Sequence, residues 1–261
     1  MYILTLFGIL LQFQVGYRHI DTAQVYGNEA DVGLACKQSG IPRSQIYVTT
    51  KLWSSQWGYD RATAAIKSSL TRLGLDYVDL MLLHHPADPN LRAETWRALE
   101  DSKDQIWRAL EDAKDQGLLK SIGVSNFSEA HIEKLLLTAK HKPVVNQIEI
   151  HPFLQRRALV KYCQKQGISL QAYSPLTRGI RLNDASLKFL ADKKGITTAQ
   201  LLIRWTIQKG YITLPKSVNA ERQFQNFNVT SFELSSEEMD SLDDLEEGWV
   251  SGWDPVANDP V

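Results

Sequence analysis

The chain has 261 residues, of which 43% are hydrophobic and 23% are charged, and its formal net charge is −1. This is the composition of an ordinary globular protein, and the balanced charge excludes binding of nucleic acid or of an anionic membrane through overall charge alone. The two cysteines show neither a metal-ligand spacing nor a disulfide framework. We therefore expect a metal-free protein of a reducing, cytoplasmic compartment.

The first residues of the chain, MYILTLFGILLQFQV, are almost wholly apolar. The run is too short to span a bilayer as a helix, and it lacks the basic start and cleavage site of a signal peptide. We expect buried core here in one of two forms. Either MYILTLF is a short first strand, or GILLQFQV is the end of a first helix.

Strand-like and helix-like segments alternate along the rest of the chain. Short apolar segments predict strands at 17–22, 46–51, 77–83, 119–124, 144–149, 168–173 and 211–214. Amphipathic stretches predict helices near 28–39, 60–73, 92–116, 128–139, 155–166 and 185–209. Strands that are apolar on both sides are typical of a parallel sheet covered by helices.

Repeated β/α units of this kind predict an α/β fold, either a (β/α)8 TIM barrel or a doubly wound sheet. No GxGxxG turn follows an early strand, so the dinucleotide fingerprint of the doubly wound fold is absent and the barrel is favoured. Composition does not change abruptly anywhere, which predicts one domain over 1–261. From residue 246 onward we expect a loop with aromatic anchors.

One internal duplication stands out. The segment WRALEDSKDQ at 96–105 recurs as WRALEDAKDQ at 107–116, changed only at Ser102 and Ala113. Eleven residues are close to three helical turns, so the second copy keeps nearly the same helix face. The expected outcome is a lengthened outer helix or a looped-out copy, not a functional array, because solenoids need several larger repeats.

Polar residues stand at the ends of three successive predicted strands. Asp21 closes YRHID, Lys51 closes IYVTTK and His84 follows YVDLMLL, while Tyr26 comes just after Asp21. Taken singly, three of these residues have simpler interpretations: Asp21 as a turn residue, Lys51 as a solvated strand end and Tyr26 as half-buried packing. In a parallel barrel, however, the C-terminal strand ends form the face where chemistry takes place. A tyrosine, a lysine, a carboxylate and a histidine meeting there suggest proton transfer to a carbonyl oxygen.

Seven motifs carry a family resemblance, in order from residue 16 to about residue 245: GYRHIDTAQVYGNE, TTKLW, YVDLMLLHHP, GVSNF, NQIEIHP, QAYSPL and LPKSVNAERQFQN. In this ordered set the chain resembles the aldo-keto reductases. The resemblance implies a (β/α)8 barrel that reduces aldehydes and ketones with NADPH and without a metal. It also implies a small carbonyl compound as the substrate, and neither nucleic acid nor membrane as a partner.

The sequence departs from the family at its N-terminus. The family normally has a further segment before GYRHID, with a hairpin and a first strand ending in a Gly-rich motif. We therefore expect the first strand/helix unit to be shortened or missing, and a monomer unless this shortening drives association. A parallel crossover needs a dozen or more residues, which leaves little room for a first strand and its helix here.

The chemistry of the four residues agrees with the roles that the resemblance implies. Hydride delivery to a carbonyl leaves an alkoxide that needs a proton, and a tyrosine with the ordinary pKa of about 10 is a sluggish acid at neutral pH. An ammonium beside the phenol stabilises phenolate, as Lys51 would do for Tyr26, and Asp21 would keep Lys51 charged and aimed. His84 would position the substrate carbonyl by a hydrogen bond. The resemblance also makes Trp53 and His85 candidate substrate-binding residues, although the family usually has Trp in place of His85.

A second set of residues resembles the family's cofactor site. Tyr173 resembles the tyrosine that stacks on the nicotinamide, and the nicotinamide carboxamide would bind to Ser125, Asn126 and Gln147. The pyrophosphate loop would contain Ser174 and Leu176. A cluster opening a helix would bind the 2′-phosphate and adenine of NADP(H); its members are Lys216, Ser217, Val218, Asn219, Arg222, Gln225 and Asn226.

A runner-up function stays open. The chain could be a relative that binds the cofactor but is a poor catalyst, acting as a binding or regulatory subunit. The complete set of four residues argues against this reading, and the shortened N-terminus argues for it. A barrel hydrolase with paired carboxylates is a poor third, since no second acid is placed opposite Asp21.

Overall fold

The computed structural model describes residues 5–56, 58–86 and 96–258. The chain forms two compact units: unit 1 comprises Met1–Asn146 together with Pro255–Val261, and unit 2 comprises Gln147–Asp254. The single domain expected from composition stays a prediction.

All seven predicted strands are present, and each end lies within two residues of its predicted position. The strands are β1 (His19–Asp21), β2 (Tyr47–Leu52), β3 (Val78–Leu83), β4 (Leu119–Ser125), β5 (Val145–Glu149), β6 (Ser169–Tyr173) and β7 (Ile212–Leu214). The described helices are α1 (Leu6–Val15), α2 (Glu29–Gln38), α3 (Tyr59–Leu73), α4 (Trp96–Asp115), α5 (Glu129–Leu136), α6 (Arg157–Lys165), α7 (Ala185–Lys194), α8 (Thr198–Gln208), α9 (Ala220–Phe227), α10 (Ser236–Asp243) and α11 (Pro255–Asn258).

Within each unit the strands follow one another in the sheet in chain order. In unit 1 the pairings β1 with β2, β2 with β3 and β3 with β4 are parallel, and in unit 2 so is that of β6 with β7. Leu80, Leu82 and Val145 form a buried cluster on these strands. Parallel strands joined through helices confirm the α/β, barrel-type fold class predicted from the repeated β/α pattern.

The apolar N-terminal run is helical where the structure describes it. The helix α1 begins at Leu6 and ends before Gly16, whose φ of 124° suits a residue without a side chain. Of the two expected forms, the helix is therefore found for GILLQFQV, and Leu6 and Phe7 of MYILTLF belong to it as well. Thr5 is the N-cap of this helix, and the rest of the alternative strand, residues 1–4, lies outside the described residues. Short apolar runs do not distinguish strand from helix by periodicity, so the sequence alone allows both forms.

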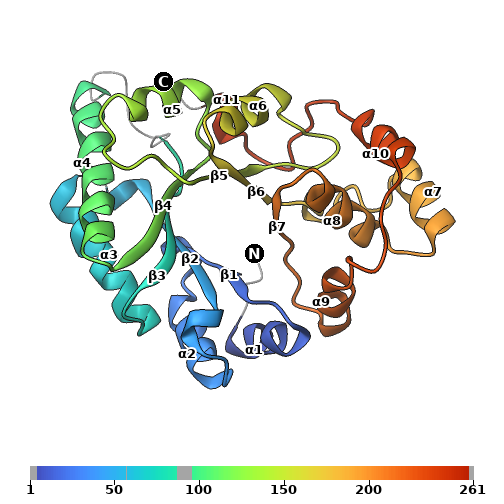
Figure 1. Cartoon of the computed structure of the whole chain (residues 1–261), viewed down its shortest axis with the longest axis horizontal. Coiled ribbons are helices and arrows are strands. Elements are labelled where there is room, and N and C mark those ends of the chain that lie inside the picture. Colours follow the sequence, from blue (N-terminus) through green and yellow to red (C-terminus); the bar gives the residue numbers. More distant parts are fainter. Residues whose placement is uncertain (1–4, 57, 87–95, 259–261) are drawn as a thin grey trace. The chain divides into compact units, whose positions relative to one another are not determined.

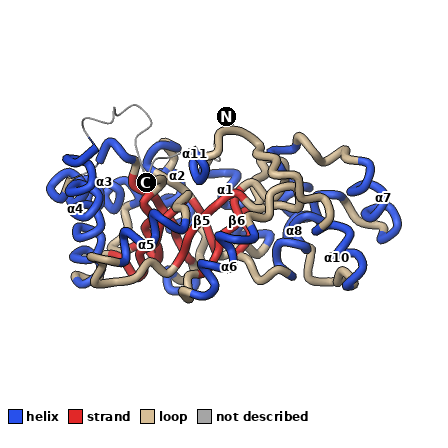
Figure 2. Tube along the Cα trace, turned by 90° about the horizontal axis from the view of Figure 1, so that it is seen from above, coloured by secondary structure: helices blue, strands red, loops and turns tan. Residues whose placement is uncertain are grey.

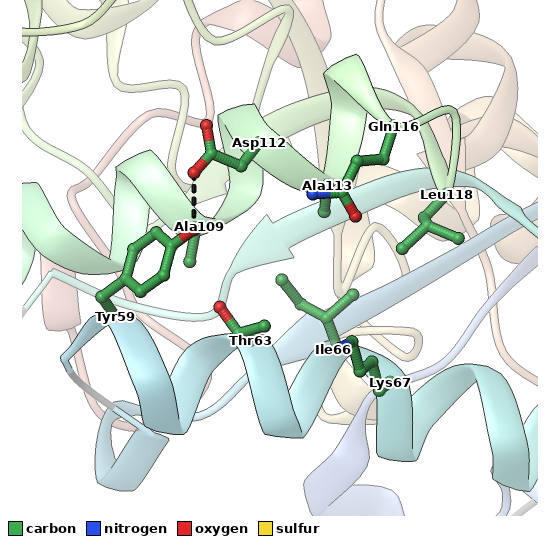
Figure 3. A pocket seen from close by; sticks show the side chains of 9 residues that line it. All are labelled: Tyr59, Thr63, Ile66, Lys67, Ala109, Asp112, Ala113, Gln116 and Leu118. Carbon is green, nitrogen blue, oxygen red and sulfur yellow. Dashed lines mark hydrogen bonds between the residues drawn. The ribbon is translucent and has the colours of Figure 1, made fainter.

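The duplicated segment is one continuous helix and not a looped-out copy. Helix α4 covers Trp96–Asp115, and in its second copy Trp107 and Leu110 are buried. Figures 1 and 2 both place α4 beside α3. Figure 3 shows how the two helices meet: the hydroxyl of Tyr59 on α3 donates a hydrogen bond of 2.6 Å to Asp112 in the second copy. The second copy thus contributes buried side chains and a hydrogen bond to this helix pair.

The predicted helix 185–209 is two helices. Helix α7 ends at Gly195, whose φ of 66° is left-handed, and α8 begins at a capping box between Thr197 and Gln200. Gly and a Thr three residues before Gln are recognised stop and start signals. The apolar periodicity that runs through both helices concealed this boundary. The tail has the expected aromatic anchor, since the ring of Trp249 contacts those of His151 and Phe153.

No helix among the described residues is long and apolar enough to cross a membrane. Cys36 and Cys163 are buried free thiols. Within the described ranges, no group of three or more His, Cys, Asp or Glu side chains could hold a metal ion. The cytoplasmic location stays a prediction.

Candidate active site

The four residues expected to do chemistry all lie in unit 1, where β1, β2 and β3 run side by side (Figure 1). Asp21 is the last residue of β1, Lys51 is in β2, and His84 directly follows β3. The register pairs Asp21 with Thr49 and Lys51 with Leu82, so the three residues stand near the C-terminal ends of adjacent strands. Tyr26 ends a short 3-10 helix in the loop after β1. Parallel pairing therefore brings residues far apart in the sequence to one edge.

Lys51 is the centre of this group. Its side chain is fully buried, and Nζ donates hydrogen bonds to Asp21 Oδ1 at 2.5 Å and to the carbonyl oxygen of Thr22 at 2.9 Å. Burial alone would lower the pKa of the Lys51 ammonium, but the charges and hydrogen bonds of Asp21 and Tyr26 raise it above its usual value. Lys51 is therefore a fixed positive charge at neutral pH.

The ring of Tyr26 lies next to this charge and contacts the ring of His84. Lys51 Nζ is 5.0 Å from the centroid of the Tyr26 ring, and the rings of Tyr26 and His84 meet edge to face at 5.7 Å. Trp53 contacts both histidines, with ring centroids 5.0 Å from His84 and 4.7 Å from His85. The predicted catalytic and substrate-side residues are thus brought together in unit 1.

His84 is held in its neutral form. Burial, followed by the nearby charges of Lys51 and His85, moves the pKa of His84 well below its usual value of 6.5. A neutral imidazole can donate a hydrogen bond from one nitrogen without adding a second positive charge beside Lys51. This suits a group that orients a carbonyl oxygen rather than one that protonates it.

Ser125 and Asn126 follow at the end of β4 and are both buried. Asn126 Nδ2 donates to the backbone carbonyl of His84 at 2.9 Å and to Ser125 Oγ at 3.1 Å. Asn126 also has a left-handed φ of 63°, which is costly for most residues but tolerated by asparagine. The backbone after β4 is therefore held next to the backbone at His84.

Sequence reasoning missed two residues in this group. Thr22 offers its carbonyl to Lys51, and its hydroxyl donates a 2.6 Å hydrogen bond to Asn28 Oδ1. A backbone carbonyl has no signature in a sequence, because every residue has one. For Asn28, the sequence offers one indication: it stands immediately before the acidic start of α2, a position that is typical of a helix cap.

In unit 2, the candidate nicotinamide residues are Gln147 and Tyr173. Gln147 is buried on β5, and its amide Nε2 donates a 2.8 Å hydrogen bond to Gln171 Oε1 on β6. Tyr173 ends β6 as a half-buried ring, and burial raises the pKa of its phenol above its usual value. Its hydroxyl therefore stays neutral, and the residue offers an uncharged aromatic face. Gln171 was not predicted from sequence as a member of the site. An amide in an otherwise apolar strand could have indicated that it has a buried polar partner.

The loop after β6 has an unusual backbone. Ser174, Thr177 and Arg178 all have φ between 50° and 53°, in the left-handed region that few side chains favour. Leu176 lies between them and is half-buried. Strain of this kind concentrates at functional loops, where the surrounding structure compensates for its cost. The predicted pyrophosphate loop therefore coincides with the most strained described segment of unit 2.

The start of α9 has the features of an anion site. Asn219 caps the helix by accepting a 2.9 Å hydrogen bond from the backbone of Arg222, and its own N–H donates to Ser217 Oγ at 3.1 Å. Lys216 and Arg222 are exposed, and partial burial lowers the pKa of Lys216. Cations beside a helix N-terminus attract phosphate groups.

The remaining predicted residues of this segment differ in exposure. Val218 is exposed, Gln225 is half-buried and Asn226 is buried. Gln223, not predicted from sequence, is buried and donates a 2.8 Å hydrogen bond to the carbonyl of Ser217. The segment that carries Lys216 is therefore tied to α9, and the donors found here fit a phosphate.

Comparisons with known proteins agree with this geometry. The model of the Aldo/keto reductase family matches residues 9–247. Glyoxal reductase of Bacillus subtilis (strain 168) is 43% identical over 230 residues, covering 88% of this chain and 79% of the relative. An aldo-keto reductase from a Medee basin deep-sea metagenome library is 40% identical with a TM-score of 0.86, covering 94% of this chain and 87% of that one. A Bombyx mori aldo-keto reductase, solved in complex with NADP, is 35% identical with a TM-score of 0.83, covering 94% and 84%.

Proposed function

Because the chain belongs to the aldo/keto reductase family, we propose that it reduces aldehydes and ketones to alcohols, with Tyr26 as the general acid. It is an NADP-dependent oxidoreductase. One observation supports the proposed chemistry most directly. The buried Lys51 ammonium is bound to Asp21 and lies next to the ring of Tyr26. An ammonium held beside a phenol stabilises the phenolate form, which is what an acid at this position requires.

The proposed division of work follows from the contacts. Reduced nicotinamide, when bound, supplies the hydride. His84, kept neutral, donates a hydrogen bond to the substrate carbonyl oxygen and orients it. Tyr26 then gives its phenol proton to the developing alkoxide, and Lys51 stabilises the phenolate that remains. Asp21 keeps the charge on Lys51 and fixes the direction of its Nζ.

We further propose residues for cofactor and substrate. Ser125, Asn126 and Gln147 would bind the carboxamide, whose burial without partners would be costly. Tyr173 would stack on the nicotinamide ring. The diphosphate and adenosine parts would be held by Ser174, Leu176, Lys216, Ser217, Val218, Asn219, Arg222, Gln225 and Asn226. Trp53 and His85, which contact each other, would line the substrate side.

The test of this function is turnover by the purified chain. We expect oxidation of NADPH that depends on an added aldehyde, followed by the loss of absorbance at 340 nm. The substrates should include a generic aromatic aldehyde, and also glyoxal, because the Bacillus subtilis relative is named glyoxal reductase. NADPH binding, followed by fluorescence, is measured in parallel. Binding without turnover on any carbonyl would contradict the proposal and favour a cofactor-binding regulatory role.

The cations at the start of α9 lead us to predict a preference for NADPH over NADH. Replacing Arg222 or Lys216 with alanine should weaken NADPH binding about tenfold each, in the lower range for hydrogen bonds to charged groups because both side chains are exposed. NADH lacks the 2′-phosphate, so its Kd should hardly change. Fluorescence titration with both cofactors gives the two Kd values. Lys188→Ala, an exposed lysine on α7, is the matched control. Wild-type binding of NADH as tight as that of NADPH would contradict the phosphate role.

A further inference from the structure

The loop that carries Tyr26 is closed by a buried side-chain hydrogen bond. The hydroxyl of Thr22, which directly follows β1, donates to Asn28 Oδ1, just before α2, at 2.6 Å. Thr22 is fully buried and Asn28 is 9% exposed. The bond therefore joins the two ends of the segment 22–28 in an environment from which water is excluded, where a hydrogen bond contributes most to holding one geometry.

Thr22 also touches the ammonium of Lys51. Its carbonyl oxygen accepts from Lys51 Nζ at 2.9 Å, and its backbone N–H donates to the carbonyl of Thr49 at 2.8 Å. All three polar groups of Thr22 are thus engaged. The hydroxyl and the N–H hold Thr22 from two sides, and its carbonyl oxygen is thereby kept facing the Lys51 ammonium.

Between its ends, the loop is held by a turn, by Gln24 and by the side chain of Tyr26. Tyr26 N–H donates to the carbonyl of Ala23 at 3.0 Å, and Gly27 has a left-handed φ of 69° that only a flexible residue adopts readily. Gln24 ties the outer side of the loop to α3 through the Ala65 carbonyl at 3.1 Å. These contacts hold the turn, and the Tyr26 side chain itself contacts Lys51 and His84. The bond between Thr22 and Asn28 holds the two ends of the loop from which this side chain extends.

We infer that Thr22 and Asn28 form a positioning pair that fixes Tyr26 and the acceptor of Lys51 relative to each other. The inference rests on the proposed function, because it assigns a task to the same acid and the same ammonium. Thr22 and Asn28 act through Lys51 and the backbone, and neither reacts itself. Misplacing reacting groups by about an ångström can lower a rate about a hundredfold, so a bond that sets this distance matters for kcat.

The experiment compares Thr22→Val with Thr22→Ser. Valine keeps the shape of threonine but removes the hydroxyl, whereas serine keeps the hydroxyl. We expect Thr22→Val to lower kcat by about 10-fold to 100-fold with little change in KM, and Thr22→Ser to restore most of it. Asn28→Ala removes the acceptor instead, and the double variant should lose no more than either single one, since both act through one bond.

The pH profile separates positioning from simple destabilisation. The titratable groups that face Lys51 are Asp21 and His19 on β1, Tyr26 in the loop and His84 after β3. Thr22→Val keeps the carbonyl that accepts from Lys51 but removes the hydroxyl that holds it in place, so this hydrogen bond to the charged form should weaken and the pKa of Lys51 should move down. The alkaline limb of the kcat profile should therefore move to lower pH in Thr22→Val. Thr206→Val is the matched control, because Thr206 is also fully buried and its hydroxyl donates to the Leu202 carbonyl at 2.8 Å in α8.

A readout that needs no turnover keeps this inference distinct from the proposed function. The nine tyrosines can be labelled with 13C at Cζ, and the Tyr26 resonance is the one lost in Tyr26→Phe. At pH 7 this resonance should shift or split in Thr22→Val and Asn28→Ala, and keep its position in Thr22→Ser and Thr206→Val. If the resonance moves while the wild type lacks turnover, the positioning pair stands and the proposed function fails. An unmoved Tyr26 resonance in both Thr22→Val and Asn28→Ala, or an equal movement in Thr206→Val, would overturn the inference.

Discussion

Replacing Tyr26 with phenylalanine should lower kcat at least about a hundredfold while leaving the Kd of NADPH nearly unchanged. General acid catalysis by a placed side chain contributes about 100-fold to 10,000-fold, and the substitution removes only the hydroxyl that would donate the proton. The phenylalanine ring keeps the edge-to-face contact with His84, which has a centroid separation of 5.7 Å. Steady-state kinetics with an aldehyde and a fluorescence titration with NADPH measure the two quantities separately.

The matched control for this variant is Tyr59→Phe. Tyr59 also loses a hydroxyl that donates a hydrogen bond, here to Asp112 between α3 and α4, as Figure 3 shows. Its contact belongs to helix packing, so kcat should be that of the wild type. Retention of most of the activity in Tyr26→Phe would remove Tyr26 from the role of acid. A parallel loss of NADPH binding would mean that the phenol serves the cofactor and not the proton.

The strands could be predicted from sequence because each is a short apolar segment bounded by turn residues. The same pattern fixed which residues stand at strand ends, and parallel pairing then required Asp21, Lys51 and His84 to meet. Residue type and strand position together were therefore sufficient for the unit 1 group. The sequence also indicates the boundary within 185–209, through Gly195 and the capping box that begins at Thr197. The apolar periodicity continues through both helices, so periodicity alone predicts a single helix.

The contacts that hold the candidate site could not be predicted in this way. The Thr22 carbonyl that accepts from Lys51 is a backbone group, so the residue type does not indicate it. The left-handed φ values after β6 arise at serine, threonine and arginine, residues that ordinarily avoid this region. The amide pair of Gln147 and Gln171 depends on which strands become neighbours, a fact of topology. Sequence patterns identify the groups that do chemistry more readily than the groups that hold them in place.

The ion pair at the centre of the site makes a prediction on stability. Lys51→Met should lower the free energy of unfolding at pH 7 by about 3 kcal/mol, because it leaves the Asp21 carboxylate without its buried partner. This is the lower end of the range for broken buried pairs, since the Asp21 side chain keeps 17% exposure and some contact with water. Urea denaturation of the variant and the wild type measures the difference. Turnover should be lost as well, since the charge that stabilises the phenolate is gone.

The double variant Asp21→Asn/Lys51→Met shows whether the loss of stability comes from the Asp21 carboxylate that Lys51→Met leaves without a partner. Asparagine cannot ionise, so most of the lost stability should return, to within about 1 kcal/mol of the wild type, while turnover stays lost. A double variant as unstable as Lys51→Met would instead assign the cost to lost packing of the lysine stem. Lys140→Met, which breaks the exposed 2.6 Å pair with Asp115, is the control and should leave the urea midpoint unchanged.

The pH dependence of the stability difference between the wild type and Lys51→Met is an independent check, because its direction follows from the raised pKa of Lys51. The pKa of Lys51 is raised in the folded chain above its ordinary value of 10.5, so its contribution is complete at neutral pH. That contribution is lost as the pH rises through the raised pKa. The stability difference between the wild type and Lys51→Met should therefore be constant from pH 7 to 9 and shrink only above pH 10.5. A difference that already shrinks between pH 7 and 9 would mean that the buried Lys51 ammonium loses its proton there, and that Asp21 does not hold its charge as the contacts imply.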